Sequence, residues 1–102
     1  MALKKEIISD NGVPLSYHRV VSVNNITNVQ SIIEIGSYVS EDERNREIEL
    51  LSYNKDNPHN TKAINVFINS TFVSIPYDEN LNVVNAYDYL KDLDMFKDAE
   101  DI

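Results

Sequence analysis

Cysteine is missing from this sequence of 102 residues. Its absence excludes a disulfide framework, a thiolate zinc site and a cysteine nucleophile together. Glycine and proline are scarce as well, with 2 and 3 residues. Two isolated glycines cannot form the glycine-rich loop that binds nucleotide phosphates, so the familiar kinds of nucleotide site are excluded too.

Positive charge is also in short supply, because 9 Lys and Arg stand against 17 Asp and Glu and the formal net charge is -8. Phosphate backbones attract clustered Lys and Arg, so we expect no nucleic-acid partner. The longest apolar runs, such as residues 66–68, are far shorter than the roughly 18 residues of a membrane span. Residues 1–6 do not resemble a secretory signal. We therefore expect a protein that contacts no membrane and stays in the cytoplasm where it is made.

The length and the hydrophobic content of 42% predict a single acidic domain that spans residues 1–102. A domain of this size buries only about two-thirds of its unfolded surface, so an interface adds substantially to its stability. Strand edges that a small sheet leaves open are suited to such an interface. We therefore expect a homo-oligomer, or docking into a larger assembly.

The N-terminal part has the pattern of an antiparallel meander. Asn11-Gly12 lies between two apolar runs and predicts a β-hairpin with a tight primed turn, because both residues tolerate positive φ. The second strand is predicted to continue through Val23, and residues 24–28 to form a turn. A third strand is predicted over residues 29–39. Its one face would hold Val29, Ser31, Ile33, Ile35 and Val39, which follow a period of two.

A helix is predicted from Ser40 to about Leu51. The segment from Ser40 to Glu43 fits a capping box, in which hydroxyl and carboxylate bond reciprocally to backbone N–H groups. Asp42 and Arg46 are four residues apart, which favours an ion pair on the helix surface. The apolar residues of the second half fit a short strand equally well, and this alternative stays open; they are Ile48, Leu50, Leu51 and Tyr53.

The second half of the chain begins with a polar loop near residues 54–62, where apolar periodicity is lost. The β-branched segment 64–75 then predicts a strand that ends at Pro76. In its first half, Ile64, Val66 and Ile68 are expected to face the core. A helix is predicted over 81–90, capped by residues 78–80, with one face formed by Leu81, Val84, Tyr87 and Leu90.

The acidic tail, residues 91–102, has apolar anchors at Leu93, Met95 and Phe96. We expect the tail to dock partly and to fray at its end. Together these elements predict an α+β fold: an antiparallel sheet of about four strands, starting with the N-terminal hairpin and meander, and a C-terminal helix packed on it.

The residues that carry chemistry elsewhere are sparse here. His18 lies in a predicted strand and indicates a partly buried, hydrogen-bonded side chain, whereas His59 lies in the polar loop and is expected to be solvated. The acidic segments 92–94 and 54–56 lack the glycine and the terminal glutamate of a calcium loop. We therefore predict no catalytic residue, no metal ligand and no cofactor, and a protein that is not an enzyme. A small hydrolase that uses His18 with a neighbouring acid is the least favoured alternative.

The 6 tyrosines are spread over most of the predicted elements. Tyrosine is enriched in recognition surfaces, but it also completes small cores with its hydroxyl at the surface. We expect half or more of the tyrosines to be core residues. Tyr87 and Tyr89 are two positions apart on a helix, so only one of them is expected to pack against the sheet.

Three stretches resemble one group of proteins when taken together. They are residues 3–12, 17–28 and 82–91, and they include Tyr17-His18-Arg19-Val20-Val21 and Asn85-Ala86-Tyr87-Asp88-Tyr89. The sequence resembles a family of small proteins that bacteriophages and prophages of Gram-positive bacteria encode among their tail and baseplate genes. The resemblance spans nearly the whole chain and carries no catalytic or ligand-binding motif.

The resemblance implies a non-catalytic structural protein of the tail, in the baseplate or tail-tip region, that acts through protein–protein contacts. Its partners would be other phage structural proteins or further copies of itself, and its location the virion, after synthesis in the cytoplasm of the bacterial host. The strand at 64–75 and the C-terminal helix are the candidate interfaces. The alternative is a soluble acidic regulator or assembly chaperone, made during infection and absent from the virion, that binds a basic protein through charge.

Overall fold

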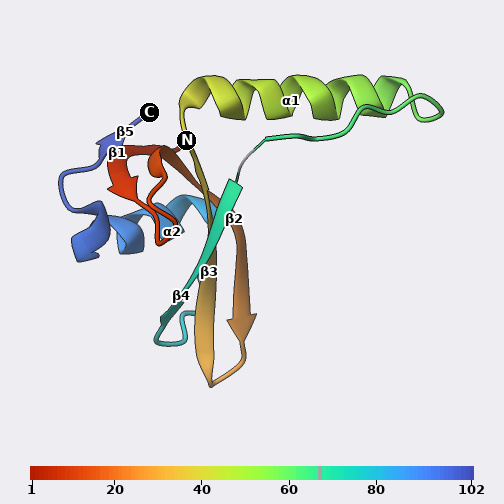
Figure 1. The fold of residues 1–102 in the computed structure, drawn as a ribbon. Coiled ribbons are helices and arrows are strands. Elements are labelled where there is room, and N and C mark those ends of the chain that lie inside the picture. The colour runs from red at the N-terminus through yellow and green to blue at the C-terminus, as the bar shows by residue number, and fades with distance from the viewer. Residues whose placement is uncertain (67) are drawn as a thin grey trace.

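The structure is a computed structural model that describes residues 1–66 and 68–102. Figure 1 shows a curved sheet with one helix packed against it and a second helix that projects as an arm. The elements are β1 (Leu3–Ile8), β2 (Pro14–Ile26), β3 (Gln30–Tyr38), α1 (Glu41–Asp56), β4 (Ile68–Ile75), α2 (Val83–Lys91), the 3₁₀ helix η1 (Asp94–Phe96) and β5 (Glu100–Asp101).

All strand pairs are antiparallel, and the order across the sheet is β4-β3-β2-β1-β5. The predicted α+β class, N-terminal meander and C-terminal helix are confirmed. The sheet has five strands instead of about four. The additional strand is β5, which the acidic tail forms by pairing Asp101 with Leu3 and Glu100 with Lys4.

The Asn11-Gly12 hairpin is confirmed, but its turn differs from the predicted primed turn. The Gly12 N–H donates to the Ser9 carbonyl at 2.8 Å, and the Ser9 N–H donates to the Val13 carbonyl at 2.9 Å. Only Gly12 of this loop has positive φ, at 80°. This is a three-residue loop, a turn followed by a left-handed glycine, which fits the twist of the strands as well as a two-residue turn does.

The meander is longer than predicted, because β2 continues past Val23 to Ile26 and the turn covers residues 27–29. Asn28 makes this turn possible with a φ of 59°. Of the predicted inner face of β3, Ser31, Ile33 and Ile35 are buried. Val29 and Val39 lie just outside β3 and are exposed. Neither residue is paired with β2 or β4.

The core lies between the concave face of the sheet and α2. It is formed by Leu3, Val20, Ile33, Ile35, Leu81, Ala86, Tyr87, Leu90 and Phe96. The Tyr87 hydroxyl accepts from the Val20 N–H and donates to the Met1 carbonyl, both at 2.9 Å. Val20 lies beyond the last residue that β1 can pair, so Tyr87 satisfies a backbone group that the sheet leaves free.

α1 settles the alternative left open for residues 40–53, which are helical after the Ser40 cap. The Ser40 hydroxyl accepts from the Glu43 N–H at 3.4 Å. The Glu43 carboxylate pairs with Arg46 and does not bond back to Ser40, so only half of the predicted capping box is formed. The predicted pair between Asp42 and Arg46 is wrong, because Arg46 pairs with Glu43 at 3.0 Å. The helix continues to Asp56, so the polar segment predicted near 54–62 begins as the last turn of α1 and becomes irregular only after it.

The strand predicted at 64–75 is present as β4 from Ile68 onward, whereas residues 64–66 are irregular and residue 67 lies outside the described residues. The predicted phase is wrong. Val73 pairs with Ile33 and Ile75 with Ser31, which places Val73 and Ile75 on the core side. Ile68 is therefore on the outer face, because the register with β3, and not local hydrophobicity, sets which side is buried.

α2 confirms the C-terminal helix, with two differences. Its cap is Asn82, which forms a reciprocal capping box with Asn85, and not the predicted segment 78–80. Val84, predicted on the packed face, is exposed, because Ala86 and Tyr87 share the buried side with Leu90. Neither helix has the length and hydropathy that crossing a membrane would require, within residues 1–66 and 68–102.

The tail docks through Phe96, which is buried, and Leu93, which packs against the core. Met95, the third predicted anchor, is exposed. The last residue is also held, since Ala2 and Ile102 exchange two backbone hydrogen bonds of 3.0 Å. The expected fraying concerns motion and stays a prediction.

Candidate interaction surface

His18 has the structural role that its place in a strand predicted. It is 2% exposed and packs edge-on against Phe96, with ring centroids 5.2 Å apart. Nε2 donates to the Lys5 carbonyl at 2.8 Å, which leaves Nδ1 to accept from the Ser37 hydroxyl at 2.7 Å. Burial lowers the pKa of His18, although the backbone bond to Lys5 opposes this. Both ring nitrogens are thus engaged across the β1–β2–β3 sheet.

The acidic side chains considered for calcium do not gather into a cluster of ligands. Among the residues that the structure describes, no three His, Asp or Glu side chains come close enough to hold an ion together. This includes the two segments considered for calcium, 92–94 and 54–56.

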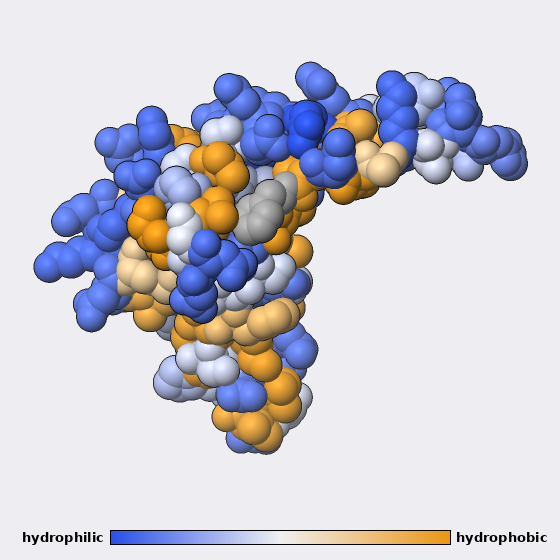
Figure 2. Space-filling view, viewed as in Figure 1, coloured by the Kyte–Doolittle hydropathy of each residue, from blue (hydrophilic) through white to orange (hydrophobic). Residues whose placement is uncertain are grey.

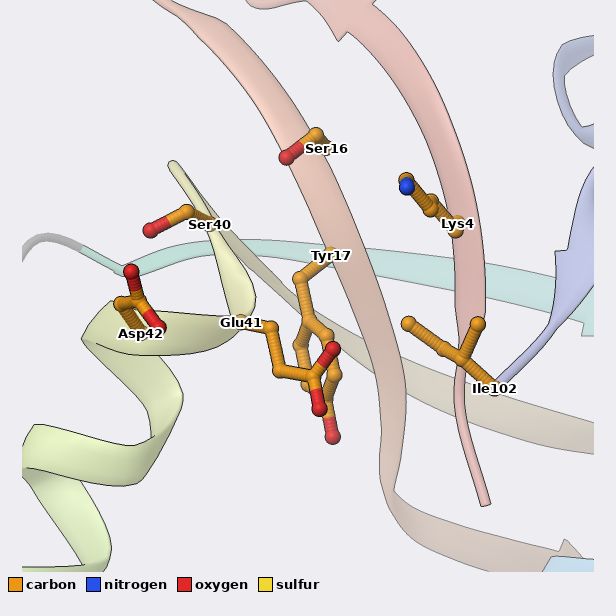
Figure 3. Close-up of a pocket in the computed structure, with 7 residues that line it drawn as sticks. All are labelled: Lys4, Ser16, Tyr17, Ser40, Glu41, Asp42 and Ile102. Atoms are coloured by element: carbon orange, nitrogen blue, oxygen red, sulfur yellow. The ribbon is translucent and has the colours of Figure 1, made fainter.

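The hollow drawn in Figure 3 lies between the start of α1, β1, β2 and the C-terminus. It is lined by Lys4, Ser16, Tyr17, Ser40, Glu41, Asp42 and Ile102. Its volume is about 210 Å³, whereas small-molecule sites occupy roughly 300–1,000 Å³. The carboxylates of Glu41 and Asp42 lie apart in Figure 3 instead of converging on one point. The hollow therefore offers little to a small ligand.

A polar cluster fastens the base of α1 to the outer face of the sheet, opposite α2. The Tyr38 hydroxyl donates to Glu47 at 2.8 Å and accepts from Arg19 Nε at 3.1 Å. Arg44 pairs with the same Glu47 carboxylate, and its guanidinium lies 5.9 Å from the centre of the Tyr38 ring. Glu47 is the one buried residue of α1. We call Arg19, Tyr38, Arg44 and Glu47 the arm anchor.

Burial raises the pKa of Tyr38, and the bond to Glu47 adds to this rise, whereas Arg19 opposes it. The phenol therefore stays protonated and keeps its donor for Glu47. A buried carboxylate is costly unless it is paired and hydrogen-bonded. The arm anchor meets this condition, and its contacts join α1 to β2 and β3.

Beyond the anchor, α1 leaves the sheet, and its apolar residues lose their cover. Ile48 and Leu51 follow Arg44 and Glu47 along the same helix face, and they are 46% and 51% exposed. The irregular segment after the helix covers another face, where Asn54 exchanges two hydrogen bonds with the backbone of Lys62. The face that packs on the sheet at the base of the arm is therefore uncovered further along.

β4 forms one edge of the sheet. Its 8 residues pair with β3 along their whole length, and in the described chain no hydrogen bond reaches the other side of its backbone. The strand, Ile-Asn-Ser-Thr-Phe-Val-Ser-Ile, has no charge and no proline. Soluble proteins protect edge strands with charged residues, proline or bulges. This edge has none of these and is open to pairing with another strand.

The outer face beside this edge is apolar. A Cβ at Gly36 would lie 2.9 Å from Val21 and 3.6 Å from Ile68, so these two side chains flank the glycine on β3. Phe72 is on the same side of β4 as Ile68 and is 66% exposed. We call Val21, Ile68 and Phe72 the outer patch. Figure 2 shows hydrophobic surface where α1 leaves the sheet and again at the projecting end of the sheet.

The opposite edge differs in character. β5 contributes only Glu100 and Asp101, and Asp101 pairs with Lys91 at 2.7 Å. A short, acidic strand is a poor template for a further strand. The β4 edge is therefore more open to a partner strand than β5 is. Within the described chain, residues 20–26 of β2 form a further uncharged edge that β1 does not pair, and there Tyr87 already bonds to the Val20 N–H.

The overall shape is extended. The extents are 44 × 30 × 24 Å and the radius of gyration is 15.1 Å, compared with about 13 Å for a compact domain of 100 residues. The arm and the projecting end of the sheet account for the difference (Figure 1). Both elements expose surface that a small domain normally buries.

Fewer tyrosines are buried than the predicted half or more. Tyr38 and Tyr87 are buried, and the other four are partly buried. Tyr87 packs in the core, and Tyr89 also packs against it and is partly buried, so the prediction that only one of the two packs is wrong. The Tyr89 hydroxyl donates to Asp78 at 2.6 Å. This bond lowers the pKa of Asp78. No tyrosine is left as an exposed recognition residue among the residues described.

The chain matches no family model, no curated protein and no solved structure. The candidate site therefore rests on the residues themselves. The sequence named the segment of β4 as a candidate interface, but its position at an edge and the exposure of Phe72 depend on strand order, which no local pattern encodes. The arm anchor was missed, because it joins residues from three separate elements.

Proposed function

We propose that this protein is a non-catalytic structural component of a bacteriophage tail, in the baseplate or tail-tip region, and that it acts through protein–protein contacts. The observation that carries the proposal is the open β4 edge with Phe72 exposed beside it. An uncharged edge of this length is a binding surface or an aggregation hazard. A protein that is built into an assembly keeps such an edge covered.

Two further features support an assembly role. The arm anchor joins the base of α1 to the sheet through the buried Glu47 carboxylate and its partners, although the arm contributes little to the core. The exposed Ile48 and Leu51 on that arm then form a second apolar contact surface. A rigid arm beside an open strand edge is suited to holding neighbouring subunits in register.

The resemblance to tail and baseplate proteins of phages gives the proposal its setting. Quantitative mass spectrometry of purified phage particles tests it, with a major tail protein as the internal reference. We expect this chain at a fixed, small ratio to the reference protein. Abundance in infected cells together with absence from particles would overturn the proposal and favour the acidic regulator or assembly chaperone.

A further inference from the structure

We infer that the occupant of the β4 edge is the β4 edge of a second copy of this chain, so that two sheets join across a two-fold axis into one continuous sheet. The inference deepens the proposed function by naming the partner at the contact surface. It rests on the charge of the edge, the distribution of its side chains and the geometry of antiparallel pairing.

Charge decides which surfaces of two copies can meet. Each copy carries a formal charge of -8, so most faces of two copies repel one another. β4 has no charged residue over its 8 positions. On the outer face, Glu34 lies opposite Phe72 on β3, and it accepts from the Ser22 hydroxyl at 2.8 Å, directed toward β2 and away from the edge. Two copies therefore meet at β4 without a charged side chain on the strand itself. Asp10 is a charged neighbour on the inner side, where it lines a hollow with Asn69 and Thr71.

Geometry restricts how the two strands pair. A two-fold axis perpendicular to the sheet makes identical strands antiparallel and keeps the outer faces of both copies on the same side. Residues opposite each other must then belong to the same face. The outer face of β4 holds Ile68, Ser70, Phe72 and Ser74, which alternate with the partly buried residues of the inner face.

More than one register places apolar side chains of the outer face opposite each other. An axis at Phe72 forms one such contact, between the two Phe72 rings, and puts Ser70 opposite Ser74. An axis at Ile68, the first residue of the strand, also forms one, whereas an axis at Ser70 forms two. With Ser70 opposite Ser70 of the second copy, Ile68 faces Phe72 of that copy, and the same contact recurs on the other side of the axis. Aromatic and β-branched residues are a favourable cross-strand pair. On the inner face this register places Asn69 opposite Thr71, so polar residues also meet polar residues. Moving the axis to Thr71 would instead place Phe72 against Ser70.

The absence of cysteine makes a direct test possible, because a single introduced thiol has no other partner in the chain. Ser70→Cys would put two sulfurs across the axis at a Cβ separation close to what a disulfide needs. Ser74→Cys is the matched control on the same strand and face. In this register its sulfurs are eight residues apart, which is about 26 Å along a strand.

Each variant is oxidised with diamide at a concentration at which the wild-type chain sediments as a dimer, and the products are separated without reductant. We expect Ser70→Cys to form a covalent dimer and Ser74→Cys to stay monomeric. Equal cross-linking of the two variants would overturn the register. A wild-type chain that sediments as a monomer up to millimolar concentration would overturn the second copy as occupant, and leave the edge to a strand of another protein.

A second pair of variants tests the side chains without cysteine. Phe72→Ser is expected to weaken the dimer about tenfold, because each dimer loses two cross-strand pairs. Val84→Ser on α2 is the matched control, since Val84 is 64% exposed and Phe72 66%. Equal dimer affinities for the two variants would contradict the inference. Its failure is separate from that of the proposed function, because a chain that pairs with another protein at β4 is still found in particles.

Discussion

Removal of one hydroxyl group from the arm anchor tests whether buried polar contacts hold α1 in place. Tyr38→Phe keeps the ring, which is fully buried, and removes the oxygen that joins Glu47 to Arg19. Glu47 keeps Arg44 as its partner. The Arg19 Nε loses its acceptor, and one carboxylate oxygen loses a donor.

Each lost hydrogen bond involves a charged group. Such bonds contribute about 1.5–3 kcal/mol, and leaving a buried partner unsatisfied costs about 1–3 kcal/mol. Arg19 is partly exposed and recovers water, so we expect the free energy of unfolding to fall by about 1–3 kcal/mol in total. For a domain of this size, this corresponds to a decrease in Tm of roughly 4–8 °C per kcal/mol.

Urea unfolding measures the global effect, and amide hydrogen exchange locates it. We expect faster exchange in α1 and little change in α2. Tyr53→Phe is the matched control, because Tyr53 lies on the same helix and its hydroxyl forms no hydrogen bond in the described structure. A surface substitution changes the free energy of unfolding by no more than about 0.5 kcal/mol. If the free energies of unfolding of Tyr38→Phe and Tyr53→Phe differ by no more than this, the arm is not held by this cluster.

Three further predictions concern the body of the domain. The lowered pKa of His18 means that the folded state resists protonation, so stability is complete above the unfolded pKa of 6.5 and falls as the pH decreases through it; urea unfolding at a series of pH values checks this, and His18→Gln should remove the dependence in this range. Asn82→Ala removes a side-chain acceptor from the capping box of α2 and should destabilise the protein by about 0.5–2 kcal/mol, with a loss of helical circular dichroism before the main transition if α2 frays. Gly12→Ala meets no atom within 4 Å but must adopt a φ of 80°, so thermal unfolding should show a cost of about 1–2 kcal/mol that comes from the backbone alone; an unchanged Tm would indicate that the turn adopts another conformation.

Local signals account for the parts of the fold that the sequence predicted. Asn11-Gly12 marked the first hairpin, Ser40 marked the start of α1, and the spacing of Leu81, Tyr87 and Leu90 marked α2. Each of these features depends on interactions within a few residues, such as a cap or a turn with positive φ. The residues that determine these features therefore lie next to them in the sequence.

Long-range pairing accounts for what the sequence did not predict. The phase of β4 follows from its register with β3, and a shift by one residue would have turned Ile68 inward and Val73 outward. β5 forms because Glu100 and Asp101 pair with the edge of β1 that β2 leaves free. Strand patterns alone favour neither outcome, since acidic residues are poor strand formers.

The candidate interaction surface also depends partly on local sequence and partly on long-range contacts. A β-branched, uncharged strand was visible in the sequence as a possible interface. The exposure of Phe72 depends on strand order, and the projection of α1 from the sheet involves the contact between Tyr38 and Glu47. The surface is therefore a property of the assembled fold.

The most direct measurement of the central claim is amide hydrogen exchange on the wild-type chain at increasing protein concentration. If β4 is the contact surface, protection of the peptide that covers residues 68–75 rises with concentration, while the peptide that covers α2 keeps a constant rate. Rates in β4 that do not depend on concentration, in a chain that nevertheless self-associates, would contradict the claim and direct attention to Ile48 and Leu51 on the arm.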